Sequence, residues 1–152
     1  MAQFIFQLEG VLRQRRNLEQ QRQRELAAHQ ARIQEMETEL RAMDRDVQGS
    51  NSHVRQHHLQ GRLDMNYLAA HRRYTLAVQR KATTLLQRMA LVQRQVEEAR
   101  VALGNAARDR KAIEKLREKQ FEEWREAASR KEMADLDEVS TQLSYQNLSE
   151  EA

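Results

Sequence analysis

The chain has no proline, no cysteine and only four glycines in 152 residues. The usual helix-breaking and turn signals are therefore almost absent. The lack of cysteine excludes a disulfide framework and thiolate chemistry, and it favours a reducing, cytoplasmic location. Aromatic residues make up 5% of the chain and charged residues 32%, a balance that argues against a large globular core. Such a composition is typical of long helices and coiled coils.

Apolar residues recur at alternating intervals of four and three along two stretches of the sequence, as in a coiled coil. We therefore expect an all-α fold of two long helices that form an antiparallel coiled-coil hairpin, with helix 2 longer than helix 1. The spacing has one irregularity, where Leu18, Arg22 and Leu26 are four residues apart in succession. This irregularity predicts a stutter, a local unwinding of the supercoil.

Glycine and polar residues near position 50 provide the one interruption of the pattern. Gly49 directly follows the last periodic residue of the first stretch, where a helix commonly stops. We predict helix 1 within residues 1–47, a connection over 48–62 and helix 2 over 63–135. The acidic, weakly periodic segment 136–152 is expected to fray.

Helix 2 is predicted to extend well beyond its partner. If residue 48 faces residue 62, Met36 lies near Tyr74 and helix 1 ends opposite about residue 107, so helix 2 overshoots by roughly 40 Å. The overshooting part keeps an apolar stripe that would suit a partner surface, formed by Ile113, Leu116, Phe121 and Trp124. Two interpretations of Trp124, the only tryptophan, remain open: it packs against Phe4 or Phe6, or it anchors a partner.

Charge is distributed unevenly along the chain. Residues 53–100 carry nine Arg and Lys residues against three acidic ones, whereas no basic residue follows Lys131. A basic arm suggests an acidic partner. Dense surface charge is, however, also common on the solvent-exposed faces of coiled coils. The apolar run at the N-terminus, Phe4–Phe6, is too short for a signal peptide or a membrane span.

No catalytic motif is recognisable. The sequence lacks a phosphate-binding glycine loop, a nucleophile elbow and paired metal-binding cysteines, so we expect no enzyme activity, no catalytic residue and no cofactor. His53 and His57, with His58 beside them, would suit a transition metal only if that segment were helical. Because we place them in a flexible connection, we expect solvated histidines and no metal site.

The sequence resembles the FliJ family, small coiled-coil components of the bacterial flagellar type III export apparatus. The resemblance is carried by the opening Phe4–Leu12, by Ala112–Lys119 with Glu132 and Leu136–Glu138, and by a polar break near position 50 that separates unequal helices. It covers essentially the whole chain.

The resemblance implies a two-helix coiled coil similar to the central axle of rotary ATPases. It implies partners as well: the hexameric export ATPase FliI at the end that bears both termini, the cytoplasmic domain of the export gate FlhA, and export chaperones, for which the protein acts as a general chaperone. We expect a cytoplasmic protein, peripheral at the inner face of the cell membrane, without direct membrane insertion and without nucleic acid. On this basis, the residues expected to bind the ATPase are Phe4, Leu8, Ile113, Leu116, Phe121 and Trp124.

The residues expected to contact the export gate form a methionine- and tyrosine-rich group near the connection, because methionine surfaces repack readily against different partners: Met36, Leu40, Met43, Tyr67 and Tyr74. Three alternatives stay open. One is the injectisome counterpart of the same architecture, one is a basic helical hairpin that binds nucleic acid, and one is a purely structural spacer.

Overall fold

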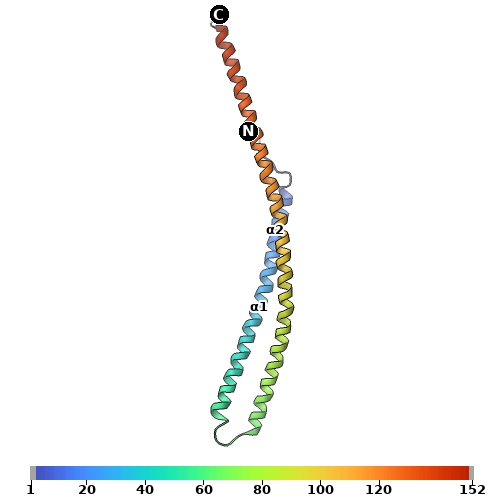
Figure 1. The fold of residues 1–152 in the computed structure, drawn as a ribbon, viewed down its shortest axis with the longest axis vertical. Helices are drawn as coiled ribbons and strands as arrows, with labels where there is room; N and C mark the ends of the chain where they lie inside the picture. The colour runs from blue at the N-terminus through green and yellow to red at the C-terminus, as the bar shows by residue number, and fades with distance from the viewer. Residues whose placement is uncertain (1–2, 151–152) are drawn as a thin grey trace. The chain divides into compact units, whose positions relative to one another are not determined.

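Two helices account for nearly all of the described chain. The computed structural model describes residues 3–150, and the side chains of residues 3–146. Helix α1 spans Glu9–His57 and helix α2 spans Met65–Glu150, with no strand among the described residues (Figure 1). The prediction of two long helices, the second longer than the first, is confirmed.

The chain divides into two compact units. The terminal unit comprises Met1–Glu19 and Ala106–Ala152, and the hairpin unit comprises Gln20–Asn105. In each unit a part of α1 packs against a part of α2. In the terminal unit, Glu9 pairs with Arg117 and Arg15 pairs with Asp109, so the two segments run antiparallel.

The two helices begin with recognisable caps. The backbone N–H of Glu9 donates to the carbonyl of Phe6 (3.2 Å), which closes the turn that precedes α1. At the start of α2, one carboxylate oxygen of Asp64 accepts hydrogen bonds from the backbone N–H groups of Asn66 (3.0 Å) and Tyr67 (3.2 Å). An aspartate in this role satisfies backbone donors that the first turn leaves unpaired.

The predicted end of helix 1 at residue 47 is wrong, because α1 continues through Gly49 to His57. A glycine in a helix interior costs about 1 kcal/mol relative to alanine. Val54, seven residues after Val47, is buried with 7% exposure, and full burial of a valine contributes about 1.5–3 kcal/mol. Burial of Val54 thus outweighs the cost of Gly49. The turn instead contains Gly61, whose φ of 85° suits glycine.

This longer α1 shifts the pairing of the helices. Phe4 packs on Phe121 in the terminal unit and His58 stacks on Tyr67 in the hairpin unit, and both pairs of residue numbers add to 125. The expected register, in which such numbers add to about 110, is therefore wrong. In this register α1, which begins at Glu9, faces α2 as far as about residue 116, and the N-terminal segment extends the contact to Phe121 and Trp124. The uncovered part of α2 therefore begins near residue 125 and not near residue 107.

The buried residues of α2 follow the heptad spacing without interruption. They include Leu85, Val92, Val96, Ala99 and Ala106, separated by intervals that fit a repeat of four and three. Such spacing keeps one side of a helix against its partner, and we call this side of each helix the heptad seam.

The predicted stutter in α1 is also wrong. Leu12 is fully buried at 0% exposure, whereas Val11 is 36% exposed. With Leu12 on the heptad seam, Arg15, Glu19 and Arg22 follow at intervals of three, four and three, and the repeat is regular. Glu19 takes the seam position in this repeat, and the apolar Leu18 lies beside it; both residues are half-buried.

The predicted end of helix 2 at residue 135 is wrong. Helix α2 continues to Glu150, and residues 129–146 are all exposed. The segment 136–150 contains neither glycine nor proline, so nothing in it breaks the helix. The prediction of fraying remains untested, and its last residues, 151–152, lie outside the described residues.

Candidate interaction surfaces

An aromatic cluster joins the N-terminal segment to α2 in the terminal unit. The ring of Phe4 meets Phe121 edge-on at 5.3 Å between centroids and lies 5.9 Å from Trp124, while Phe121 and Trp124 stack at 5.8 Å. Phe6, from the same N-terminal segment, is buried at 6% exposure. Aromatic pairs at these separations stabilise by about 0.5–1.5 kcal/mol beyond their burial.

The sequence predicted that the apolar stripe of α2 is uncovered. The structure shows instead that the N-terminal segment covers part of it. Of the two interpretations of Trp124, its packing against Phe4 is the one that the structure confirms. Ile113 is half-buried, as is Leu8 of the N-terminal segment. Leu116 and Phe121 remain partly accessible, with 37% and 41% exposure. The six residues predicted to bind the ATPase thus lie in one unit, and three of them, Phe4, Phe121 and Trp124, contact each other.

A set of charged residues links α1 to α2 in the same unit, and sequence reasoning missed it. Four ion pairs cross between the helices: Glu9–Arg117, Arg15–Asp109, Arg16–Glu114 and Glu19–Arg110. The sequence signal was the presence of charged residues at seam positions of both helices. That signal could be interpreted only with the correct register, which places opposite charges beside each other.

Arg110 is the centre of this charge network. Its guanidinium donates to Glu19 across the helices and to Glu114 within α2 (2.6 Å). The hydrogen bond to Glu19 raises the pKa of Arg110 above its ordinary value, and the nearby charge of Glu114 adds to this effect, while partial burial opposes it. Arg110 therefore remains a cation at any working pH and fixes two carboxylates in place.

From residue 125 on, α2 continues past the described residues of α1 and of the N-terminal segment (Figure 1). We call residues 125–145 the free stem, and the side chains of residues 129–145 are all exposed. The apolar side chains of the free stem are strongly exposed: Met133 at 67%, Leu136 at 68%, Val139 at 53%, Leu143 at 54% and Tyr145 at 70%. Isolated exposed apolar residues are ordinary, but a series on one unaccompanied helix marks a surface for association.

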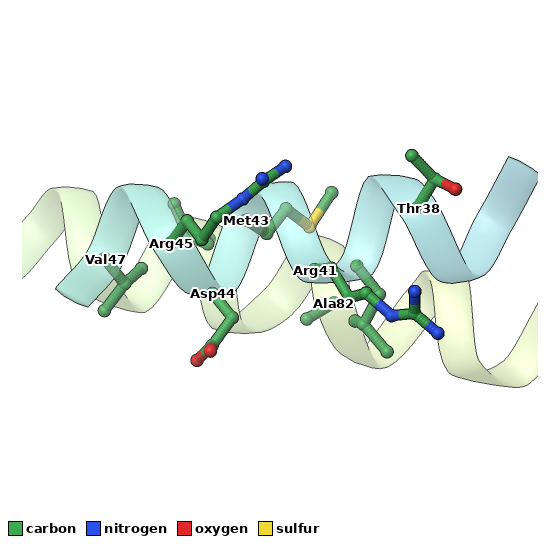
Figure 2. A pocket seen from close by; sticks show the side chains of 9 residues that line it. Thr38, Arg41, Met43, Asp44, Arg45, Val47 and Ala82 are labelled. Carbon is green, nitrogen blue, oxygen red and sulfur yellow. The ribbon is translucent and has the colours of Figure 1, made fainter. Parts of the chain in front are cut away.

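In the hairpin unit, a groove of about 810 Å³ lies between the two helices (Figure 2). Its apolar lining comes from seam residues, while Thr38, Arg41, Asp44 and Arg45 of α1 also border it; the apolar residues are Leu40, Met43, Val47, Val78 and Ala82. In Figure 2, the charged ends of Arg41, Asp44 and Arg45 extend outwards from the ribbon of α1. The heptad seam here is only half closed, since these apolar residues are half-buried.

The structure brings together some of the predicted gate-binding residues and separates others. Leu40 and Met43 line the groove, and Met36 is half-buried further along α1. Tyr67 is occupied by its stack with His58, at 3.7 Å between ring centroids. Tyr74 is 42% exposed on α2. Tyr74 is thus the predicted residue most available to a partner.

Most cations of the basic arm on α2 form no ion pair, the exception being Arg100, which pairs with Glu97. Between residues 65 and 96 this helix carries no acidic residue, and no ion pair joins α1 to α2 among the described residues of the hairpin unit. Six cations on this stretch lack an ion-pair partner: Arg72, Arg73, Arg80, Lys81, Arg88 and Arg94. Their charge is available to an acidic surface.

Neither a membrane span nor a larger metal site is present among the described residues. No stretch of either helix there is both long enough and apolar enough to span a lipid bilayer. Over the same residues, no group of three or more His, Cys, Asp or Glu side chains is arranged to hold a metal ion.

Comparison with known proteins identifies the family. No curated protein and no solved structure matches the chain significantly. The model of one family, described as flagellar FliJ protein, matches residues 4–149, which is nearly the whole chain. The chain therefore belongs to the FliJ family of flagellar, export-related proteins.

Proposed function

We propose that this protein is a component of flagellar protein export that engages the export ATPase FliI through its terminal unit and the export gate FlhA through its hairpin unit. The observation that carries the proposal is the free stem, an exposed helix with apolar side chains next to an internally braced aromatic cluster. Family membership supports the flagellar system over the injectisome counterpart, because the matching model is that of the flagellar family.

The free stem suits insertion into a protein ring. It begins directly after Trp124, the last residue of the aromatic cluster, and at 1.5 Å per residue its helix reaches roughly 30–40 Å beyond that cluster. Burying a large apolar side chain in a partner is favourable by about 1.5–3 kcal/mol, so burying even half of the exposed series would contribute several kcal/mol before the cost of association. The partly exposed edge of the aromatic cluster, at Leu116 and Phe121, extends the same surface.

The ATPase contact can be tested with two exposed residues of the free stem. Leu136 and Leu143 are seven residues apart and share one face of α2. The double change Leu136→Asp with Leu143→Asp should abolish stimulation of ATP hydrolysis by purified FliI. Thr141→Asp, on the opposite face, is the matched control and should stimulate like wild type. Full stimulation by the double variant would exclude the free stem as the ATPase contact.

The gate contact needs a separate measurement. We propose that the groove and the exposed Tyr74 bind the cytoplasmic domain of FlhA, with the unpaired cations of α2 attracting acidic residues of that partner. Tyr74→Ala should weaken binding in a pull-down titration, whereas Tyr145→Ala, a tyrosine of the free stem, should not. Equal affinities for both variants would place the gate contact elsewhere.

We further propose that the protein acts as a general export chaperone, handing export chaperones to the apparatus at the membrane. This part of the proposal is supported by family membership and by the half-closed groove, whose methionine-containing lining can repack against different helices. It assigns the protein no catalytic role.

A further inference from the structure

Three of the five histidines lie together at the end of α1. The rings of His53 and His57 have centroids 4.7 Å apart, and the ring of His58 lies 5.4 Å from that of His53. His53 and His57 are both exposed. Because α1 continues through His57, the two side chains are four residues apart on one helical face, which is the condition that the expected flexible connection did not meet.

We propose that His53 and His57 chelate a divalent transition metal of borderline softness, of the class of Ni²⁺, Zn²⁺ and Cu²⁺. Imidazole suits this class of ion. With metal–nitrogen bonds of about 2.0–2.1 Å, two imidazoles bound to one ion at 90–110° have ring centroids about 4.5–5.2 Å apart. The observed separation of 4.7 Å falls within that range, so the spacing of the two rings is compatible with a shared ion.

The position in the helix also favours a cation. His57 is the last residue of α1, where the carbonyl groups of the final turn leave partial negative charge. Arg55 opposes a bound cation, but a spacing of two residues places it on the other side of the helix. A metal binds the neutral form of an imidazole.

Two protein ligands define the proposed site. His58 is held in its stack with Tyr67, and no third ligand completes a larger group among residues 3–150. Water therefore fills the remaining coordination positions of the ion. A cation held by His53 and His57 would join two successive turns and stabilise the end of α1 beside the loop that contains Gly61. The site is independent of the proposed ATPase and gate contacts.

The test uses the full, untagged chain, titrated calorimetrically with NiCl₂ and with ZnCl₂ at neutral pH. One ion per chain is expected. His53→Gln and His57→Gln should each weaken binding by roughly tenfold or more, since the loss of even an outer-shell partner of a metal site costs 10–100-fold. His58→Gln should change the affinity little. Helical content, followed by circular dichroism, should be the same in all variants because His53 and His57 are exposed.

A rescue variant separates chelation from a general loss of histidine. Gly49→His combined with His57→Gln moves the pair one turn along α1, so that positions 49 and 53 hold the two imidazoles. Gly49 is exposed, and a side chain there begins in open space. This variant should regain most of the wild-type affinity, whereas Arg55→His combined with His57→Gln should not. Wild-type affinity in the His53→Gln, His57→Gln double variant would overturn the proposal.

Discussion

The two units of this chain hold the same pair of helices together by different means. In the terminal unit, charged residues occupy seam positions, and four ion pairs cross between α1 and α2 beside an aromatic cluster. In the hairpin unit the described residues form no such ion pair, and the seam is mainly apolar. Heptad spacing therefore specifies which side of a helix faces its partner without specifying the chemistry of the contact.

A second contrast lies within the hairpin unit. Val92 and Val96 are buried at 8% and 2% exposure, whereas Val78 and Ala82, at equivalent seam positions, are half-buried along the groove. Side-chain size alone does not account for the difference, because Ala99 and Ala106 are as short as Ala82 and yet are buried at 9% and 4% exposure. The same repeat thus produces a closed seam in one segment and a half-open one in the next.

The comparison between closed and open seam predicts the largest effect on stability. Leu12→Ala, at a fully buried position of the terminal unit, should lower the free energy of unfolding by about 3 kcal/mol, because it removes buried methyl groups and leaves a cavity. Val78→Ala, beside the groove, should cost about 1 kcal/mol, since its side chain is half-buried already.

Urea denaturation followed by circular dichroism measures both changes, with Val96→Ala as the matched valine at a closed position. Val96→Ala should cost clearly more than Val78→Ala. Equal costs for the two valines would mean that the seam is as closed at Val78 as it is at Val96, and that the groove is filled in solution.

The aromatic cluster offers the next effect, smaller and local to the terminal unit. Phe4→Ala removes the ring that covers Trp124, and should cost about 1 kcal/mol or somewhat more from the lost aromatic contacts. Because Trp124 is the only tryptophan, its fluorescence reports this region alone, and the emission should shift to longer wavelength. Ile5→Ala, at a 79% exposed neighbour, is the control and should leave the spectrum unchanged.

Much of the fold was readable from the sequence because its determinants are local and repeated. Heptad spacing and the absence of proline predicted two long helices, and the structure confirms them. The end of α1 was missed for a different reason. A glycine is a local stop signal, but Gly49 is overridden by a contact that forms seven residues after Val47, where Val54 is buried.

That single boundary determined how well the site could be predicted. In a helical hairpin the position of the turn determines which residues of the two helices face each other. Because the turn was predicted at the wrong residues, every predicted facing pair was wrong as well. Phe4, Phe121 and Trp124 were each selected from the sequence as important, yet their mutual contact could be offered only as one of two interpretations. The ion pairs of Arg110 were missed because they depend entirely on register.

The position of the turn at Gly61 predicts that alanine substitutions at Gly49 and Gly61 change the free energy of unfolding by about 1 kcal/mol in opposite directions. Gly49→Ala should stabilise the protein by about 0.5–1 kcal/mol, because Gly49 is inside a helix and an added Cβ meets nothing within 4 Å. Gly61→Ala should destabilise it by about 1 kcal/mol, because φ at Gly61 is +85°. Thermal denaturation of both variants measures the signs. Destabilisation by Gly49→Ala would indicate that helix 1 ends near residue 47 and that Gly49 is not inside a helix.

The smallest expected effect sharpens the contrast in charge between the two units. Arg15 pairs with Asp109 across the helices at 3.1 Å, and both side chains are about half exposed, whereas Arg94 is an exposed arginine of the hairpin unit without an ion pair. Exposed pairs of this kind contribute about 0.2–1 kcal/mol and are screened by salt.

Arg15→Gln should therefore destabilise the protein by that amount at low ionic strength and by almost nothing in about 1 M NaCl, where the Debye length is near 3 Å. Arg94→Gln should be close to neutral under both conditions. Urea denaturation measures the change in the free energy of unfolding for each variant at each salt concentration. The salt-dependent part of the change for Arg15→Gln, minus that for Arg94→Gln, gives the contribution of the ion pair separately from the loss of the arginine stem. If Arg94→Gln shows the same salt-dependent loss, the hairpin unit also depends on charge pairing, and the division of the two units by chemistry would not hold.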